Sequence, residues 1–260
     1  APCLTARAAL RSGAGLVKAG VPESIWNVVA TKLDECTTTG LADTRQGALS
    51  LRALGTIREE CAWSSVVVFG PGLSTKPQAP RVAHRVMRCV ERPLVLDADG
   101  LNAFAGPHTG KLAQAQAAQP RRTLVLTPHP GEAARLLDTT PERIQRDRSS
   151  AARELCKLAG PGTIVVLKGA GTLVTDGARL YVNTTGNPGM ASGGTGDVLS
   201  GMLGALLGQG LEGFEAAVLG VYLHGLAGDW AAKRLGEWSL VAGDLIDELP
   251  HAFLKHAARR

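Results

Sequence analysis

The stretch Asn187-Pro-Gly-Met-Ala-Ser-Gly-Gly-Thr-Gly-Asp197 leads directly into an apolar helical pattern, Val198-Leu-Ser-Gly-Met-Leu203. Four glycines, at positions 189, 193, 194 and 196, fall within eight residues before that pattern. Glycine lets the backbone approach an anion closely, and the first turn of a helix offers N–H groups without intrahelical partners at the positive end of a dipole. The stretch therefore predicts an anion-binding loop that opens a helix over 197–208.

Asp197 stands at the start of this predicted helix. An acidic residue in the first turn suits the helix dipole, so Asp197 could be a helix-start residue and nothing more. A carboxylate beside a bound phosphate is electrostatically unfavourable unless it has a chemical task, such as taking a proton from an attacking hydroxyl. We interpret Asp197 as a candidate catalytic base.

Four short apolar runs precede the glycine loop, at 66–69, 94–96, 124–126 and 164–167. Each is bounded by Gly, Pro or Asp, and each is nearly continuous rather than alternating. That pattern is typical of parallel strands buried on both faces. A hairpin is predicted over 172–182, where Asp176-Gly177 forms a tight-turn pair between two apolar runs.

Helical patterns fill the intervals between these runs, at 4–16, 24–33, 47–61, 78–91, 131–138 and 141–159. Thr140 and Pro141 form a plausible start for the last of them. After Gly186 the pattern is helical, over 197–208, 213–235 and 241–257, and no repeat or linker divides the 260 residues. We predict one α/β domain over 1–260, with a largely parallel central sheet flanked by helices and a helical C-terminal third.

Composition narrows the classes of partner. The net charge is +5, but the basic residues are scattered and aromatic residues make up only 4% of the chain, so a nucleic-acid surface is disfavoured. Attraction to phosphorylated small molecules and a plain solvated face explain the charge equally well. The five cysteines show no CxxC spacing, which favours reduced thiols in a cytoplasmic protein. The most apolar stretch, 198–207, is too short to span a membrane.

Other chemistry-bearing residues have a structural reading as well as a functional one. Asp97 and Asp99 follow a strand and could hold Mg²⁺ through water, or Asp99-Gly100 could form a turn. His129 is held between two prolines at a strand end, and Lys168 follows a buried strand and precedes a glycine. Helix packing alone accounts adequately for the segment 224–229, His-Gly-Leu-Ala-Gly-Asp.

A glycine loop followed by an Asp that opens a helix resembles the ribokinase-like superfamily, in which that Asp activates a substrate hydroxyl. The longer string 187–201 narrows the resemblance to the NAD(P)H-hydrate dehydratase family. Five other segments are similar to that family in one colinear order, 70–73, 96–102, 126–132, 166–172 and 224–229. The resemblance runs from about Ala1 to the C-terminus, and six motifs in order are far more specific than one.

The resemblance implies a set of site residues. Asp197 is the implied base, and the implied contacts to the hydrated nicotinamide substrate are Ala1, Gly72, His129 and Asp197. Lys168, Gly169, Ala170, Gly171 and Thr172 are expected to line the nucleotide, with Gly193, Gly194 and Gly196 at its phosphates. Mg²⁺ and ADP or ATP are the implied cofactor and co-substrate, and a homotetramer is the implied assembly.

The implied reaction transfers the terminal phosphoryl group of the nucleotide to the hydroxyl of hydrated NADH or NADPH. The ring nitrogen then expels phosphate, which restores the double bond. Two rival functions stay open: a small-molecule kinase on the same fold, such as a hydroxyethylthiazole-kinase-like enzyme, and a nucleotide-sensing module without turnover. Intact Asp197 and the full glycine loop argue against the sensing module, and the six motifs favour the dehydratase over the kinase.

The start of the chain carries one further expectation. In the resembling family a buried strand and a glycine-rich turn precede the position of Ala1. A parallel sheet that lacks an inner strand would leave ladder hydrogen bonds unpaired. The expectation is that the 260 residues are part of a longer gene product, with the alternative that another strand fills the gap.

Overall fold

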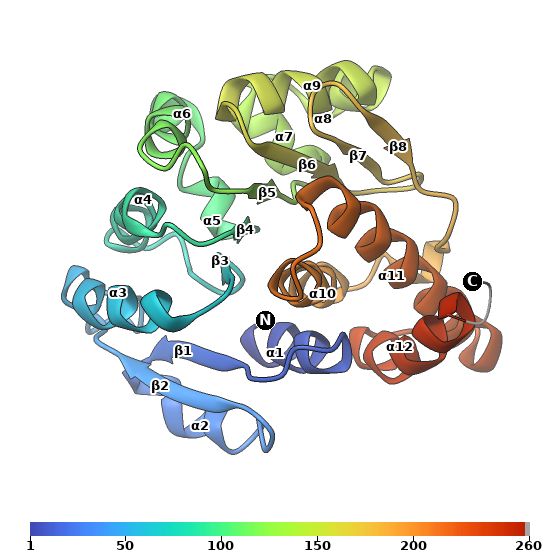
Figure 1. Cartoon of the computed structure of the whole chain (residues 1–260), viewed down its shortest axis with the longest axis horizontal. Helices are drawn as coiled ribbons and strands as arrows, with labels where there is room; N and C mark the ends of the chain where they lie inside the picture. The colour runs from blue at the N-terminus through green and yellow to red at the C-terminus, as the bar shows by residue number, and fades with distance from the viewer. Residues whose placement is uncertain (258–260) are drawn as a thin grey trace.

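The computed structural model describes residues 1–257, and a six-stranded sheet forms its centre (Figure 1). The strands lie in chain order, and β3 to β6 are parallel, whereas β7 and β8 complete the sheet in antiparallel fashion. Their bounds are β3 (Val67–Phe69), β4 (Leu94–Leu96), β5 (Leu124–Leu126), β6 (Thr163–Leu167), β7 (Leu173–Thr175) and β8 (Leu180–Val182). The predicted α/β class, the four strands and the 172–182 hairpin are therefore confirmed.

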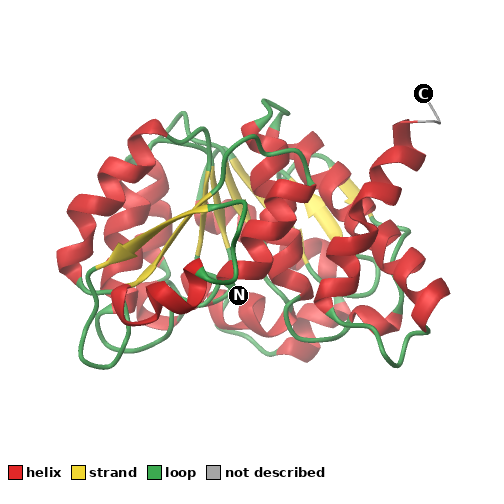
Figure 2. Ribbon diagram, turned by 90° about the horizontal axis from the view of Figure 1, so that it is seen from below, coloured by secondary structure: helices red, strands yellow, loops and turns green. Residues whose placement is uncertain are grey.

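Both faces of the sheet are buried, because alternate side chains of the same strands enter two different cores. Leu94 and Leu124 point into one core, whereas Val95 and Val125 point into the other. Helices cover both sides of the sheet, as Figure 2 shows. The first core is covered by α4 (Ala79–Cys89), α6 (Gly110–Ala117) and α9 (Arg148–Ala159), and the second by α10 (Thr195–Gly208) and α11 (Gly213–Leu235).

The remaining helices form an outer layer and several connections. α1 (Pro2–Arg11) and α12 (Ala242–Ala257) pack with α10 and α11 around a third apolar core. The connecting helices are α3 (Leu54–Trp63), α5 (Asp99–Asn102), α7 (Pro130–Leu136) and α8 (Pro141–Arg146). Short 3₁₀ turns lie at Glu23–Ile25, Leu51–Ala53, Gly106–His108 and Pro188–Met190. Within residues 1–257, no helix combines the length and the apolar character needed to cross a bilayer.

The sequence did not predict the small parallel sheet of β1 (Lys18–Pro22) and β2 (Thr37–Leu41), joined by the short α2 (Trp26–Ala30). These strands contain Gly, Pro and a run of Thr, and they lack the apolar continuity that marks the central strands. The helix predicted over 24–33 is accordingly shorter, and strands flank it. The predicted 141–159 helix divides at Asp147, whose backbone is not helical, with φ of −142° and ψ of 78°. The Asp147 side chain caps α9 by accepting from Ser150 N.

The parallel arrangement positions the candidate site. The strands β3 to β6 all end at one edge of the sheet, so the segments that follow residues 69, 96, 126 and 167 lie side by side there. In parallel α/β sheets this carboxyl edge is where ligands bind. Four of the six motifs singled out in the sequence therefore meet at the same edge.

α1 and α10 approach each other closely at Gly201. A Cβ at this position would overlap the carbonyl oxygen of Thr5 and lie 3.0 Å from Cβ of Ala8. This contact sets how near α1 comes to α10, and it brings Ala1 to the helix start that carries Asp197.

Gly201→Ala should therefore destabilise the protein by about 1–3 kcal/mol, because the added methyl group forces the two helices apart. Gly55→Ala is the matched control, since Gly55 is exposed in α3 and a Cβ there meets nothing within 4 Å. The control should gain up to about 1 kcal/mol from lower backbone entropy in the unfolded chain. Thermal and urea unfolding measure both, and equal stability of the two variants would contradict the close contact.

Candidate active site

The glycine loop ends at Gly194, which has a left-handed backbone conformation and caps α10. Gly194 is the N-cap with φ of 95°, and a Cβ there would lie 2.5 Å from Cδ1 of Leu4. A Cβ on Gly193 would meet nothing within 4 Å, so the loop is open at that point. The helix begins at Thr195, two residues before the predicted start, and its hydroxyl lies 2.9 Å from the Met190 carbonyl oxygen. The N–H groups in the first turn of α10 therefore lie next to an open part of the glycine loop.

Two polar atoms of this loop lack hydrogen-bond partners. Within the described part of the chain, neither Oγ of Ser192 nor Oδ1 of Asn187 has one, although both atoms are buried. Buried polar groups in folded proteins are nearly always paired with protein, water or ligand. These two atoms are therefore left for water or a ligand to pair with.

Asp197 lies in the first turn of α10 with a side chain that is 18% exposed. Burial raises the pKa of Asp197, and the carboxylate of Asp97 adds to the rise, whereas Lys168 opposes it. The backbone nitrogen of Ala1 lies 3.7 Å from Oδ2 of Asp197, and a Cβ on Gly72 would lie 3.3 Å from Cβ of Ala1. The structure thus brings Ala1, Gly72 and Asp197 together, as the sequence analysis expected.

A buried ion pair lies beneath the glycine loop. Nζ of Lys168 donates to Oδ1 of Asp97 at 2.8 Å, and the hydroxyl of Ser200 in α10 donates to the other Asp97 oxygen at 2.7 Å. Glu132 Oε2 lies 3.8 Å from the same ammonium. A Cβ on Gly196 would lie 3.4 Å from Nζ, so Lys168 sits directly against the first turn of α10. A buried charge is tolerated only when it is paired in this way.

His129 is the N-cap of α7 and forms a capping box with Glu132. Nδ1 of His129 accepts from the N–H groups of Gly131 and Glu132, and the Glu132 carboxylate accepts from the N–H of His129 at 2.8 Å. Burial lowers the pKa of His129, and Lys168 contributes to the lowering. The Glu132 carboxylate connects His129 to Lys168, so this residue also belongs to the cluster. Glu132 was not a predicted site residue; only its spacing of three from His129 matches a capping box, whose usual first residue is Ser, Thr, Asp or Asn.

The carboxylates of Asp97 and Asp99, the weak magnesium candidates, are both engaged in hydrogen bonds within the chain. Oδ2 of Asp99 accepts from Ser74 N and Oδ1 from Asn102, so this carboxylate holds the 70–74 turn while Asp97 holds Lys168. No group of three His, Cys, Asp or Glu side chains arranged for a metal ion occurs among the residues described. The two aspartates therefore act as anchors of the loops around the site.

The expected nucleotide segment, 168–172, is an exposed turn between β6 and β7. Gly169 and Gly171 adopt φ of 137° and 59°, which L side chains rarely adopt, and the Thr172 hydroxyl donates to the Gly169 carbonyl oxygen. Nη2 of Arg148 donates to the carbonyl oxygen of residue 167 at 3.0 Å, which adds positive charge beside the turn. Arg148 was not a predicted site residue, since the sequence shows it only as one of three arginines, at 143, 146 and 148, within a predicted helix.

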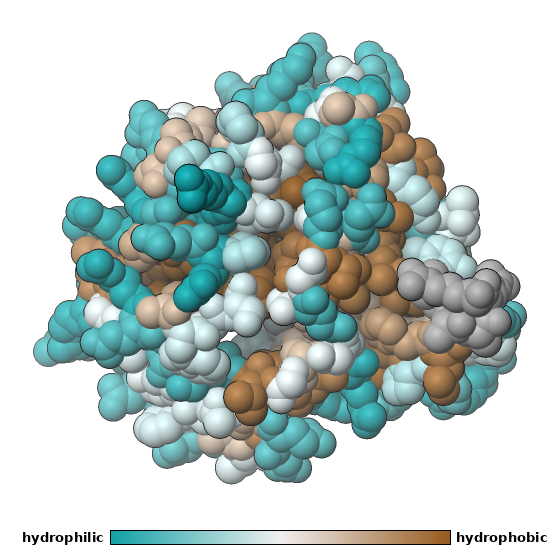
Figure 3. All heavy atoms as spheres, in the orientation of Figure 1, coloured by the Kyte–Doolittle hydropathy of each residue, from teal (hydrophilic) through white to brown (hydrophobic). Residues whose placement is uncertain are grey.

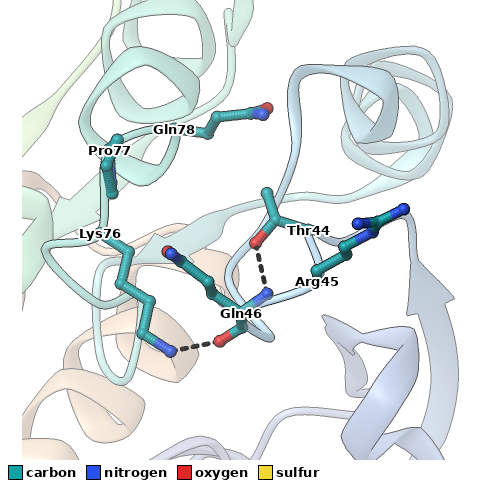
Figure 4. A pocket seen from close by; sticks show the side chains of 6 residues that line it. All are labelled: Thr44, Arg45, Gln46, Lys76, Pro77 and Gln78. Atoms are coloured by element: carbon teal, nitrogen blue, oxygen red, sulfur yellow. Dashed lines mark hydrogen bonds between the residues drawn. The ribbon is translucent and has the colours of Figure 1, made fainter.

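A separate depression of about 260 Å³ lies on the surface away from these residues (Figure 4). The ammonium of Lys76 donates to the carbonyl oxygen of Gln46 across it. None of the predicted site residues lines this depression, and no carboxylate does. Its lining is Thr44, Arg45, Gln46, Lys76, Pro77 and Gln78.

Comparison with known proteins gives one consistent family. A family model described as NAD(P)H-hydrate dehydratase matches residues 1–251. A bifunctional NAD(P)H-hydrate repair enzyme from Moorella thermoacetica is 46% identical over 95% of this chain and 46% of its own length. An ADP-dependent (S)-NAD(P)H-hydrate dehydratase from Neisseria meningitidis is 38% identical over 97% of this chain and 78% of its own. The chain spans about half the length of the bifunctional relatives that it matches.

A solved structure leads to the same family. The ADP/ATP-dependent NAD(P)H-hydrate dehydratase from Bacillus subtilis, co-crystallised with ATP and Mg²⁺, superimposes with a TM-score of 0.77 at 26% identity. The match covers 98% of this chain and 84% of that one. The ribokinase-like fold class expected from the glycine loop is confirmed.

Proposed function

Because the chain belongs to the NAD(P)H-hydrate dehydratase family, we propose that it uses ADP or ATP to dehydrate hydrated NADH or NADPH, releasing phosphate and the reduced cofactor. One observation carries the proposal. A mostly enclosed carboxylate with a raised pKa, Asp197, stands at the start of a glycine-opened helix beside Ala1 and Gly72. The helix start suits a phosphate, and the carboxylate suits the proton of a hydroxyl that attacks it.

The proposed reaction solves a leaving-group problem. Hydroxide leaves poorly, whereas phosphate leaves readily, so the hydroxyl of the hydrate is first phosphorylated. Asp197 takes the hydroxyl proton as the oxygen forms its bond to phosphorus and the bond to the rest of the nucleotide breaks. The lone pair of the ring nitrogen then expels phosphate, and loss of a proton from the adjacent carbon restores the double bond.

The chain's own groups supply positioning and charge for the transfer. The N–H groups of Gly193 and Gly194, just before α10, and of Gly196, in its first turn, offer donors for phosphate oxygens. Lys168 adds a positive charge against Gly196. The exposed 168–172 turn offers room for the nucleoside. We propose Mg²⁺ as a companion of the nucleotide, held mainly by phosphate and water, which agrees with the engaged state of Asp97 and Asp99.

We also propose that the protein works as a homo-oligomer, with a tetramer as the expected form. Three large apolar side chains, those of Leu16, Trp238 and Leu254, are 80%, 103% and 68% exposed, and contact with another copy of the chain would bury such side chains. Hydrophobic residues also gather over the middle and right of the face in Figure 3, around α10 and α11. All five cysteines are free thiols, which suits a cytoplasmic location.

The direct test is an absorbance assay at the reduced-nicotinamide band. Hydrated NADH or NADPH with Mg²⁺ and ADP or ATP should regain that absorbance and release inorganic phosphate in equal amount. A stable phosphorylated product without recovered absorbance would instead assign the chain to the small-molecule kinases. Nucleotide binding without any turnover would favour a sensing module.

Asp197→Asn should lower turnover by roughly 10²–10⁴, because the amide cannot accept the hydroxyl proton. It should not lower stability at pH 7. The folded-state pKa of Asp197 is raised, so the protonated carboxyl stabilises the fold only at low pH, and that contribution is lost as pH rises through the raised pKa. In the wild type, the rate should fall on acidification at a higher pH than an ordinary aspartate would give.

Asp244→Asn is the matched control for this variant. Asp244 also lies in the first turn of a helix, α12, and accepts from Val241 N, but outside the candidate site. It should lose about 1 kcal/mol of stability and keep its turnover. Comparable turnover of Asp197→Asn and Asp244→Asn would remove Asp197 from the mechanism.

Gly193→Ala should weaken ADP binding by about tenfold without affecting folding, because the methyl group occupies the open approach to the phosphate donors. The backbone of Gly193 is outside the left-handed region, and a Cβ there meets nothing within 4 Å. Gly110→Ala at the start of α6 meets the same two conditions and should leave ADP affinity unchanged. Calorimetric titration with ADP compares them, and an unchanged affinity in Gly193→Ala would place the phosphate elsewhere.

A further inference from the structure

The motif His-Gly-Leu-Ala-Gly-Asp at 224–229 has no place in the chemistry described so far, yet four of its residues contact the segment that leads into α10. A Cβ on Gly225 would overlap Thr185, and one on Gly228 would overlap the side chain of Met190. The two glycines therefore let 185–190 lie directly on α11. Asp229 accepts hydrogen bonds from Gly186 and Asn187, near the start of this segment, and His224 bonds to Thr195, five residues beyond its end.

His224 is bonded to the first residue of α10. Its Nε2 lies 2.9 Å from the carbonyl oxygen of Thr195, and a carbonyl can only accept, so Nε2 carries the proton and donates. Some of the ring surface remains accessible, but the imidazole is surrounded by protein, and burial lowers the pKa of His224 to about 4. The nearby Lys168 ammonium contributes to this lowering of the pKa. His224 is thus a neutral donor with one defined tautomer near pH 7.

The acceptor of this bond belongs to the peptide group that also carries the N–H of Gly196. A peptide group is planar, so a donor that fixes the carbonyl also fixes the direction of the N–H on the other side. Donation to the oxygen also polarises the group and makes its N–H a stronger donor, as in any hydrogen-bonded chain. His224 therefore acts on the Gly196 N–H without touching any ligand.

Asp229 performs a similar task at the other end of the segment. Its two carboxylate oxygens accept from the N–H of Gly186 and from Nδ2 of Asn187, each at 3.0 Å. The Thr185 hydroxyl donates to the carbonyl oxygen of Tyr222, also on α11, at 2.8 Å. The stem of the glycine loop is therefore tied to α11 before the loop begins.

We infer that His224 and Asp229 are positioning residues, which hold the glycine loop on α11 so that the Gly196 N–H points at the phosphate of a nucleoside diphosphate or triphosphate. This inference rests on the proposed function for the identity of the ligand. It assigns to α11 the task of presenting the anion-binding N–H groups, and it gives the 224–229 motif a role beyond helix packing.

Selective labelling makes the two peptide groups visible in the whole chain. Only four Thr–Gly pairs occur in the sequence, 39–40, 109–110, 185–186 and 195–196. Labelling threonine with ¹³C at the carbonyl and glycine with ¹⁵N therefore gives four filtered amide signals. Two of them report on Asp229 and His224, and the pairs at 39–40 and 109–110 are internal controls.

The variants separate hydrogen bonding from packing. His224→Phe keeps a ring but cannot donate, whereas His224→Gln places an amide N–H near the position of Nε2. His84→Phe is the matched control, because Nε2 of His84 lies 2.7 Å from the Ala103 carbonyl oxygen, in α4 and away from the glycine loop. Asp229→Asn turns one acceptor oxygen into a donor that faces Nδ2 of Asn187.

His224→Phe should shift the Gly196 amide proton upfield, raise the Kd for ADP by about five- to tenfold and lower kcat more than it changes KM for the hydrate. His224→Gln should restore the signal and bring the Kd to within about threefold of wild type. His84→Phe should lose thermal stability with no change in the Gly196 signal or the ADP affinity. Asp229→Asn should shift the Gly186 signal and weaken ADP binding.

An unshifted Gly196 signal in His224→Phe would overturn the inference, and so would equal losses in His224→Phe and His224→Gln. If His224→Phe does not fold, Asp229→Asn decides, since ADP affinity equal to that of the wild type would show that α11 does not position the loop. The ADP titration and the amide signals need no hydrate. A wild-type protein without dehydratase activity would therefore refute the proposed function and still leave this inference open to its own test.

Discussion

The ion pair between Lys168 and Asp97 is the interaction on which the geometry of the site depends. Asp97 follows β4 and Lys168 follows β6, and the 2.8 Å bond between them spans the end of β5. The second oxygen of Asp97 accepts from Ser200, which joins the same pair to α10. A buried charge must keep its partner. These contacts therefore hold the start of α10 in a fixed position against the carboxyl edge of the sheet.

The same pair sets the charge around the loop. Burial is the main cause of the raised pKa of Asp197, and the Asp97 carboxylate adds to it. Burial is also the main cause of the lowered pKa of His129 and His224, and the Lys168 ammonium adds to that lowering. The two histidines are therefore favoured in the neutral state beside Lys168, and Asp197 holds a proton more readily than an exposed aspartate. In the proposed reaction, this one contact would place a cation near the phosphate and raise the pKa of the base, with both histidines neutral.

The parts of the fold that the sequence predicted are those that a single physical signal specifies. Continuous apolar runs predicted β4 and β5 to the residue, because a strand buried on both faces needs them. β1 and β2 carry no such signal, since they are short, partly exposed and interrupted by Gly and Pro. At the site, spacing identified the glycine loop and the strand-end motifs. It could not show that Lys168 pairs with Asp97, 71 residues away, because that contact depends on the order of strands in the sheet.

Fold alone cannot separate a dehydratase from a kinase at such a site. In the proposed chemistry both enzymes transfer a phosphoryl group to a hydroxyl, so both need a base like Asp197 and donors like those at the start of α10. The elimination that follows is driven by the substrate's ring nitrogen and needs no further base of unusual strength. We therefore propose that the distinction lies in which alcohol fits beside Ala1 and Gly72. Residues around Ala1 and Gly72 should determine which substrate binds. Residues at the contact of α10 with α11 should serve phosphoryl transfer, whichever hydroxyl is bound.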